Sequence, residues 1–525
     1  MTQKKSEGPI LPEGRRKSAS TQEAERPGGG KGTPVNQQTW QLGLPFATAD
    51  DPETPEAVGR VHGDTDRDRS LPASFVVPKA KSKERTAMSA TLEEVVEGLG
   101  EAFRNVASNQ GAPGPDRRSI VEVQEHLDEI LPKLASDLLS GTYRPGMIRR
   151  VWIPKEGGGQ RGLGIPDVVD RVVQEALRAV LDPLDEPTFH SNSHGFRKGR
   201  SCHTAIAQAV EYLKEGHEIV VDLDLEKFFD QVCHQRLMAR LSQRVEDRRL
   251  LVLIGQMLKA KVIMPDGVVV STEEGVPQGG PLSPLLSNIV LDELDWELDQ
   301  RKHAFVRYAD DVNIYVRSER AGHRVMESVT RFIEKRLRLK VNARKSAVAP
   351  PEDRHFLGFS LRRNPLDGEV EVKLSERSLK RIAQRICELT PRNWGDSLRR
   401  CISQLNVYLR GWIGFFGICT ASEEKTLMNL DAHIRRRLRA ILLKQWKRKR
   451  IILRQLKQLG ARHPAAWGAV YKKRKSLWAL SVHPVVNRTI RNRYFFERGL
   501  VPVAERWRTL RLPSAAPRQL ALQLG

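Results

Sequence analysis

Two short apolar segments that carry aspartates restrict the fold of this chain more than any other feature of its sequence. Residues 218–225 are mostly apolar and β-branched, with Asp224 near their end. This pattern predicts a buried strand that delivers a carboxylate to the rim of a sheet. Residues 305–316 predict a strand, a two-residue turn and a second strand, with Asp310 and Asp311 in the middle. Because neighbouring strands bring distant residues together, we expect the three carboxylates to lie close to one another.

Three carboxylates held close together have few chemical uses. Without a cation they repel one another and raise one another's pKa. Hard oxygen ligands of this kind suit Mg²⁺, which usually takes one or two carboxylates and completes its octahedron with water and substrate phosphates. Two such ions about 3.5 to 4 Å apart can activate an attacking 3′-hydroxyl and stabilise the leaving oxygen in phosphoryl transfer. Adjacent aspartates are also common at hairpin turns for conformational reasons, so the pair alone does not establish a metal site.

The distribution of charge points to a polyanionic partner. The chain has 525 residues, with 87 Lys and Arg, 64 Asp and Glu and a formal net charge of +23. Residues 371–525 hold 34 basic and 9 acidic side chains, a net charge of +25, whereas residues 1–370 carry a net charge of −2. A helical bundle with arginine on its solvated face is the alternative, but so one-sided a bundle would repel itself without a polyanion. We therefore expect this end of the chain to bind nucleic acid.

Composition and periodicity separate a tail from a folded body. Residues 1–85 are rich in Gly, Pro, Ser, Lys and Glu, which predicts a mostly disordered tail. Over residues 86–370, strands are interspersed with helices of differing length, which predicts an α+β fold. After residue 371 the chain reads as helical. Within the α+β part, spacings of three and four predict one amphipathic helix over residues 120–138, behind a capping box that starts at Ser119.

The cysteines and the apolar runs bear on the compartment. Five cysteines, an odd number with no Cys-x-x-Cys pair, argue against a disulfide framework and a thiolate zinc site. No run of about 18 or more apolar residues exists, and the N-terminus lacks an apolar signal core, which argues against membrane spanning and secretion. We therefore expect a cytoplasmic protein with no membrane partner.

Three strings of residues resemble one polymerase family. They are Asp-Leu-Glu-Lys-Phe-Phe-Asp at 224–230, Gly-Val-Pro-Gln-Gly-Gly-Pro-Leu-Ser-Pro at 275–284 and the Tyr-Ala-Asp-Asp-bearing hairpin at 305–316. In this order they resemble the palm motifs of bacterial group II intron reverse transcriptase/maturases. The resemblance implies α+β fingers and palm of a right-hand polymerase, followed by an all-helical thumb (maturase X) domain. Its divisions would be a disordered tail at 1–85, fingers at 86–215, palm at 216–370, thumb at 371–475 and a small basic DNA-binding appendage at 476–525.

The resemblance assigns roles to the aspartates. It implies that Asp224 and Asp310 ligate both Mg²⁺ ions and that Asp311 supports the site. Asp222 is the rival for the first of these roles. Only the spacing within the string 224–230, which fits the family, selects Asp224 over Asp222.

The resemblance also implies a set of nucleotide contacts. Phe229 falls where the family has an aromatic steric gate, whose ring beside C2′ admits deoxynucleotides and clashes with ribonucleotides; a place in the core is the alternative for this side chain. Further contacts with the incoming nucleotide are implied at Lys155, Arg161, Gln278, Gly279 and Lys345. Arginine and lysine suit a triphosphate through forked and point-charge contacts respectively, although ordinary surface charge is the alternative for Lys155 and Arg161.

In the basic end, the string at 405–416 resembles the thumb of the same family, which binds the template–primer duplex and the intron RNA. Structured RNA is recognised through phosphate, 2′-hydroxyl and stacking contacts, which suits Arg and Lys interleaved with Trp and Tyr. RNA contacts are thereby expected at Arg197, Arg200, Arg410, Arg435, Arg436, Arg437, Lys447, Arg448 and Lys449.

Together these features imply an RNA-directed DNA polymerase that uses Mg²⁺ and is coupled to a maturase role in group II intron splicing and mobility. Its partners would be intron RNA, an RNA template with a DNA primer, dNTPs and target DNA. No cysteine follows Cys419 and the sequence ends at residue 525, so we expect no HNH endonuclease. Two alternatives stay open: a host-domesticated reverse transcriptase of DNA repair or phage defence, and a splicing-only RNA-binding maturase.

Overall fold

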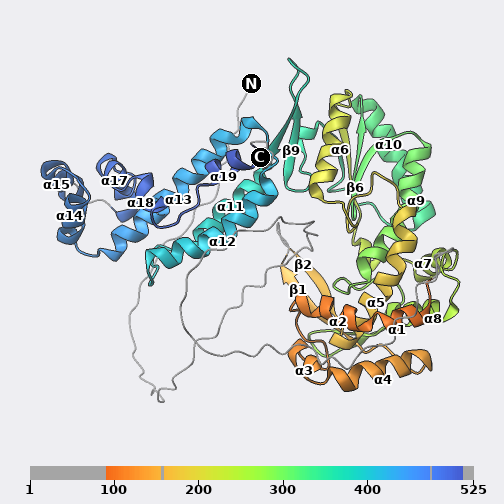
Figure 1. The fold of residues 1–525 in the computed structure, drawn as a ribbon. Helices are drawn as coiled ribbons and strands as arrows, with labels where there is room; N and C mark the ends of the chain where they lie inside the picture. The colour runs from red at the N-terminus through yellow and green to blue at the C-terminus, as the bar shows by residue number, and fades with distance from the viewer. Residues whose placement is uncertain (1–89, 155–158, 473–475, 512–525) are drawn as a thin grey trace, which may run out of the picture. The chain divides into compact units, whose positions relative to one another are not determined.

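The computed structural model describes residues 90–154, 159–472 and 476–511 (Figure 1). The predicted disordered tail at 1–85 lies outside the described residues, and so does Lys155. The described part consists first of helices and strands together and then mainly of helices, as the predicted α+β fold with a helical domain requires. None of the helices in these ranges is long and apolar enough to cross a membrane.

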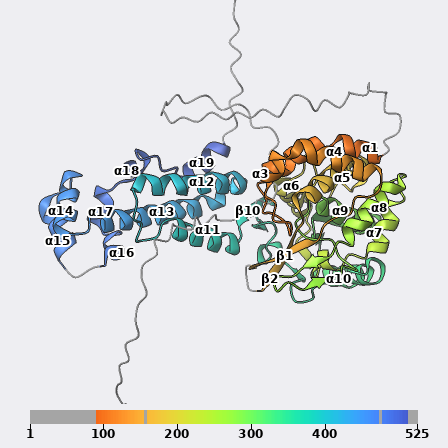
Figure 2. The ribbon, with the colours of Figure 1, turned by 90° about the horizontal axis from the view of Figure 1, so that it is seen from below.

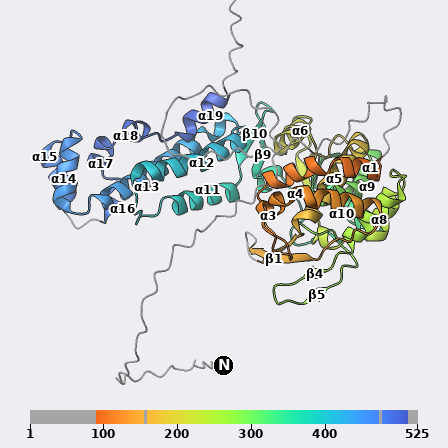
Figure 3. The same ribbon diagram turned by 60° about the horizontal axis from the view of Figure 1, so that its bottom comes forward.

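The fingers combine a helical layer with a small sheet. Their helices are α1 (Leu92–Glu97), α2 (Leu99–Ser108), α3 (Ile120–Glu125), α4 (Leu127–Leu139) and α5 (Val168–Asp185). The sheet consists of β1 (Ile148–Pro154), β2 (Gln160–Ile165), β4 (Val262–Ile263) and β5 (Val269–Val270), in the order β2-β1-β4-β5. Figure 3 labels β1, β4 and β5. Helix α5 packs against α2 and buries Val168, Val173 and Leu177 in the core, because its apolar residues recur at helical spacing.

The helix predicted over residues 120–138 is divided in the structure. α3 ends at His126, whose backbone φ and ψ are −113° and 22°. The ring Nδ1 of His126 lies 3.1 Å from the carbonyl oxygen of Glu122, which is the acceptor that the N–H of His126 would use in a continuous helix. That N–H donates to the carbonyl of Gln124 instead. The prediction of one helix is therefore wrong, whereas the capping box between Ser119 and Glu122 is confirmed.

The palm is built on an antiparallel sheet with the strand order β6-β7-β3-β8. Its strands are β3 (Ile219–Asp224), β6 (Ala304–Tyr308), β7 (Asp311–Val316) and β8 (Ala347–Ala349). The helices of residues 186–353 are α6 (Cys202–Lys214), α7 (His234–Leu241), α8 (Arg248–Leu258), α9 (Ser283–Gln300) and α10 (Glu319–Phe332), with shorter helical turns η1 (Glu186–Thr188), η2 (Phe228–Asp230), η3 (Ile333–Leu337) and η4 (Pro351–Asp353). The division between fingers and palm at 215/216 stays a prediction. In β3, Val221 and Leu223 are fully buried, and strand alternation places Asp222 and Asp224 together on the other face.

A hairpin of β9 (Phe359–Arg363) and β10 (Val370–Leu374) precedes the helical domain. Its helices are α11 (Glu376–Leu389), α12 (Leu398–Phe416), η5 (Ala421–Glu423), α13 (Glu424–Gln445), α14 (Lys449–Gln458), α15 (His463–Tyr471), α16 (Leu477–Leu480), α17 (Pro484–Thr489), α18 (Asn492–Phe496) and α19 (Val503–Arg511). Helices α11, α12 and α13 pack side by side (Figure 2). The predicted helical start at residue 371 is wrong for four residues, because Val372 and Leu374 alternate into the core as strand residues.

The last helix packs into the same core as the thumb helices. α19 contacts α12 and α13, and the buried Trp507 donates from Nε1 to the carbonyl of Cys419 at 3.2 Å. The carboxylate of Asp431 in α13 accepts the N–H groups of Val503 and Ala504 at 2.9 and 3.1 Å, which caps the start of α19. The division at 475/476 and the DNA-binding role of the appendage stay predictions.

Candidate polymerase active site

The turn between β6 and β7 presents two of the three predicted aspartates. Pairing ends with Tyr308 opposite Asp311, which leaves Ala309 and Asp310 as the turn. Ala309 has a φ of +56°, a left-handed conformation that is uncommon outside turns for residues other than glycine. The predicted strand, turn and strand are confirmed.

The register of the palm sheet places Asp224 beside this turn. β3 pairs antiparallel with β7 so that Asp224, the last residue of β3, lies opposite Asp311, the first residue of β7. Antiparallel pairing brings the end of one strand and the start of the next to the same rim. The three aspartates singled out from the sequence are therefore neighbours in the structure.

Loss of hydration and mutual repulsion raise the pKa of Asp310 and of Asp311. Burial raises the pKa of Asp310, and the charge of Asp224 adds to this, while the cations of Arg161 and Lys345 oppose it. The pKa of Asp311 rises to about 7 through loss of hydration among the surrounding protein groups and through the charges of the neighbouring aspartates. Asp311 is nevertheless solvent-exposed, so water moderates the shift. Carboxylates crowded in this way favour a bound cation.

Lys345 forms an ion pair with the carboxylate of Asp224. Its Nζ lies 2.9 Å from Oδ2 and 3.3 Å from Oδ1 of Asp224. The loop that carries Lys345 is tied to the end of β3, because Asn342 donates its N–H to the carbonyl of Asp224 at 2.8 Å and the Ser346 hydroxyl accepts the N–H of Asp224 at 3.0 Å. The predicted nucleotide contact Lys345 thus lies at the aspartate site.

Arg354 distinguishes Asp222 from Asp224. Its Nε donates to Oδ2 of Asp222 at 2.9 Å and its Nη2 contacts the same oxygen. Nη2 also donates to the carbonyl of Lys345 at 2.8 Å. Asp222 therefore has an arginine partner that fixes the loop, whereas Asp224 is paired with Lys345. Sequence reasoning did not identify Arg354, which lies far along the chain.

The carboxylates of Asp224, Asp310 and Asp311 are oxygen ligands of the kind that a hard divalent cation prefers. The ammonium of Lys345 rests on one of them, which shows that the site stabilises positive charge. Within residues 90–511, the described part holds no group of three His, Cys, Asp or Glu side chains arranged to hold a metal ion unaided. Substrate phosphates and water would have to complete the coordination, as is usual for Mg²⁺.

A fully buried ion pair holds the turn that carries Asp310. It was not predicted from the sequence. Arg307 in β6 and Asp295 in α9 are both 0% exposed, with Nε to Oδ1 at 2.7 Å and Nη2 to Oδ2 at 2.5 Å. Nη1 of Arg307 donates to Oδ1 of Asn288 at 2.9 Å and to the carbonyl of Ala309 at 3.0 Å. The guanidinium thus fixes the turn residue that precedes Asp310. An arginine inside an apolar strand was the available signal.

The two phenylalanines after β3 take different places. Phe228 is 2% exposed and belongs to the core, whereas Phe229 is half-buried. The carbonyl of Phe229 accepts the N–H of Val276 at 2.6 Å, and Gly275 has a φ of +93° with the Phe229 carbonyl 2.9 Å from where a Cβ would stand. The glycine string therefore packs on the backbone of Phe229, and Phe229 is the ring available to a nucleotide.

The other predicted nucleotide contacts lie at the junction of the fingers sheet and the glycine string. The carbonyl of Gln278 accepts the N–H of Gly164 in β2 at 2.7 Å. A Cβ on Gly279, whose φ is +124°, would stand 2.5 Å from the Gly164 carbonyl, so only glycine fits this approach. Arg161 in β2 is exposed, and its charge reaches Asp310.

Arg197 does not have the exposure that a template contact needs. Its side chain is buried, bonds to Glu186 from Nε at 3.0 Å, and donates from Nη1 to the carbonyls of His190 and Ser193 at 2.6 and 2.9 Å. The structure therefore corrects this prediction: Arg197 holds its own loop together. Arg200 is half-buried and its RNA contact stays a prediction.

Among the basic residues of the helical domain, Arg437 needs the same correction. It is 8% exposed, and it donates to the hydroxyl and the carbonyl of Thr390 at 2.6 Å each and to the carbonyl of Cys387 at 3.0 Å. It joins α13 to the end of α11. The remaining predicted RNA contacts are two half-buried arginines and four exposed cations. They are Arg435, Arg436, Arg410, Lys447, Arg448 and Lys449. The guanidinium carbon of Arg436, one of the half-buried pair, lies 3.9 Å from the Trp478 ring centroid.

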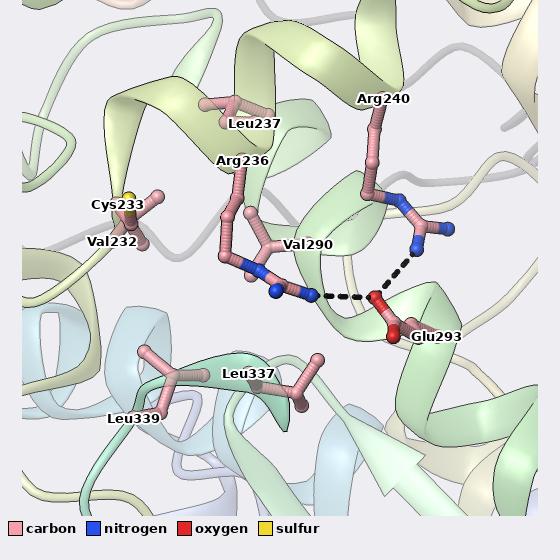
Figure 4. A pocket seen from close by; sticks show the side chains of 9 residues that line it. All are labelled: Val232, Cys233, Arg236, Leu237, Arg240, Val290, Glu293, Leu337 and Leu339. Atoms are coloured by element: carbon pink, nitrogen blue, oxygen red, sulfur yellow. Dashed lines mark hydrogen bonds and ion pairs between the residues drawn. The ribbon is translucent and has the colours of Figure 1, made fainter. Parts of the chain in front are cut away.

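A small pocket on the palm involves none of the predicted site residues (Figure 4). Arg236 and Arg240 of α7 both donate to Oε2 of Glu293 in α9, at 3.1 and 3.0 Å. These ion pairs join two palm helices, and apolar side chains such as Leu337 line the rest. The pocket is therefore a structural feature of the palm.

Two protein-family models match this chain. The model of the family described as reverse transcriptase (RNA-dependent DNA polymerase) matches residues 153–361, which contain the sheet, the aspartates and Lys345. The model described as group II intron, maturase-specific domain matches residues 379–460. The chain thus joins a reverse transcriptase domain to a maturase domain.

Curated relatives agree with these matches. Protein YkfC of Escherichia coli K12 is 35% identical over 318 residues, which are 53% of this chain and 83% of that protein. Group II intron-encoded protein LtrA of Lactococcus lactis is 37% identical over 209 residues, or 39% of this chain and 34% of LtrA. The putative COX1/OXI3 intron 2 protein of Saccharomyces cerevisiae is 28% identical over 293 residues, 45% of this chain and 34% of that protein. The chain spans about a third of the length of the two intron-encoded relatives. The chain belongs to the family of bacterial group II intron reverse transcriptase/maturases.

Proposed function

We propose that this chain is an RNA-directed DNA polymerase with Asp224, Asp310 and Asp311 as its catalytic aspartates. One observation carries the proposal: Asp224 pairs with Asp311 across β3 and β7, beside the turn that holds Asp310. Three carboxylates at one rim of a buried sheet are what nucleotidyl transfer with divalent ions requires.

The same three carboxylates would hold two Mg²⁺ ions together with substrate phosphates. When bound, such ions activate the 3′-hydroxyl of the primer and stabilise the leaving oxygen. Lys345 neutralises Asp224 in the free protein and contacts the leaving pyrophosphate when a dNTP is bound. Arg161 contacts the triphosphate, and Phe229 excludes a ribose 2′-hydroxyl. Arg307 holds the turn in place.

The polymerase is coupled to a maturase role, in which the helical domain binds the folded intron RNA and promotes its splicing. In intron mobility, the same protein acts on the intron RNA and on target DNA. The exposed cations Arg410, Lys447, Arg448 and Lys449 support this role, because phosphate contacts supply most of the affinity for nucleic acids. No acidic residue occurs between positions 432 and 496, so this stretch of the chain, which includes Lys447, Arg448 and Lys449, carries only positive charge.

Primer extension on poly(rA)/oligo(dT) tests the polymerase. The wild-type protein with dTTP and Mg²⁺ is expected to extend the primer, chelation by EDTA to abolish synthesis, and added Mg²⁺ to restore it, because the crowded carboxylates need a cation. A wild-type protein that promotes intron splicing yet extends no primer with any divalent ion contradicts the proposal and favours a splicing-only maturase.

The maturase role is tested by intron RNA binding in a salt series. Replacing Lys447, Arg448 and Lys449 with glutamine is expected to weaken binding and to flatten the slope of log K against log salt by about 0.7 to 0.9 for each lost phosphate contact. Arg437→Gln is the control for position: it removes one positive charge from a buried site, so it should lower thermal stability without changing the slope. Equal slopes for the triple variant and wild type contradict the role given to these cations.

A further inference from the structure

Helix α15 carries an exposed pair of aromatic rings. Trp467 and Tyr471 are 45% and 37% exposed, and their rings are stacked, with centroids 5.7 Å apart and an interplanar angle of 23°. Residues four apart share one face of a helix. The residues that α15 buries are Ala466, Ala469 and Val470, so the helix packs on the core through small and aliphatic side chains and leaves the two rings exposed.

The other tryptophans near this region are used differently. Trp412 and Trp507 are 8% and 3% exposed and belong to the core. Trp478 is half-buried beneath Arg436, whose guanidinium carbon lies 3.9 Å from the ring centroid. Exposing a large ring loses the free energy that burial would provide. The position of Trp467 therefore needs another explanation than packing within the described residues.

The backbone beside the rings leaves room for a flat ligand. Gly468 follows Trp467, and a Cβ built on it would meet only the Cδ of Lys472, at 3.7 Å. Pro464, one turn before Trp467, is also exposed. This face of α15 therefore presents the two rings beside a glycine and a proline that add little bulk.

One cation lies against these rings, and others are exposed on the neighbouring helix and loops. Nζ of Lys449 in α14 lies 5.5 Å from the Tyr471 ring centroid, within the range of a cation–π interaction. Other exposed cations on α14 and the flanking loops are Arg448, Arg450, Arg454, Lys457, Arg462 and Lys472. Stacked rings among positive charges suit a ligand that has flat bases and anionic phosphates.

We propose that Trp467 and Tyr471 form a stacking site for unpaired bases of RNA. Bases inside a duplex are already stacked and cannot lie on a protein ring, whereas bases of loops and single strands can. RNA is the occupant because α15 packs directly on α14, and α14 lies within the maturase match at 379–460. The site goes beyond the proposed function, which assigns RNA binding to exposed cations alone.

Binding of a single-stranded oligo(A) RNA and of an rA·rU duplex of equal length, without dNTPs, tests the site in the full chain. Trp467→Ala is expected to weaken binding of the single strand by about 5- to 100-fold, which is the range for loss of one base–aromatic stack, and to leave duplex binding unchanged within about twofold. Trp467→Phe keeps a ring and should retain most of the affinity. Trp296→Ala is the matched control, because Trp296 in the palm is 43% exposed and should change neither affinity.

Three results would overturn the proposal. Equal losses on single strand and duplex would show that the variant disturbs only the charged surface. Unchanged single-strand affinity in the double variant W467A/Y471A, with thermal stability like that of wild type, would show that the rings bind no base. Tighter binding of oligo(dA) than of oligo(A), lost in Trp467→Ala, would assign the site to DNA.

Discussion

Replacing Asp310 with asparagine is expected to lower the rate of DNA synthesis by about 10³-fold or more. The substitution keeps the shape of the side chain and removes one negative charge from the carboxylates gathered at the end of β3 and the start of β7. Divalent ions stabilise a phosphoryl-transfer transition state by several kcal/mol, and each 1.36 kcal/mol is a factor of about ten in rate. Primer extension on poly(rA)/oligo(dT) at saturating dTTP measures this loss.

Asp222→Asn is the matched control for this prediction. Asp222 lies on the same strand and face as Asp224, yet it is the partner of Arg354. Its substitution should lower thermal stability, because Arg354 loses a charge-assisted bond, and it should retain far more synthesis than Asp310→Asn. Intron splicing should survive Asp310→Asn, since the helical domain is untouched. If the Asp222 and Asp310 variants lose synthesis equally, the assignment of the metal ligands is wrong.

The strands of this site could be predicted from sequence because their signal is local. A short apolar, β-branched run over 218–225 and the apolar residues on both sides of the aspartates in 305–316 indicated the strands. The adjacent aspartates indicated the turn, which the structure places one residue earlier, at Ala309 and Asp310. Only the structure supplies the register that sets Asp224 opposite Asp311. The resemblance of the three strings to palm motifs already implied that these aspartates lie close together, because the strands that carry them would pair in one sheet.

Three of the errors have a common physical origin, since they concern side chains whose partners are backbone carbonyls. Arg197 and Arg437 looked like exposed cations, but carbonyl oxygens of His190 and Thr390 accept their N–H groups inside the protein. Every residue has a backbone carbonyl, so the sequence does not show which carbonyls accept hydrogen bonds from arginine. Counting charges therefore cannot distinguish a buried arginine from a solvated one. The ring of His126 likewise takes the Glu122 carbonyl and ends a helix that apolar spacing would have continued.

The second large effect is expected at Arg307, a positioning residue. Removing one partner of a buried ion pair leaves the other charge unpaired and costs about 3 to 5 kcal/mol. Arg307→Met should therefore reduce the free energy of unfolding by about this amount, because Asp295 is fully buried. Thermal and urea denaturation measure the loss, and activity should fall with it.

The double variant R307M/D295L separates stability from positioning. Replacing both partners of a buried pair by apolar residues of similar volume is often neutral or stabilising, so the double variant should recover most of the lost stability. It cannot recover the bond from Nη1 to the Ala309 carbonyl, which holds the turn before Asp310. We therefore expect the folded double variant to bind RNA normally while its kcat for primer extension stays at least about tenfold low, the result of losing about 1.4 kcal/mol of transition-state stabilisation. Recovery of activity in step with stability would show that Arg307 serves the fold alone.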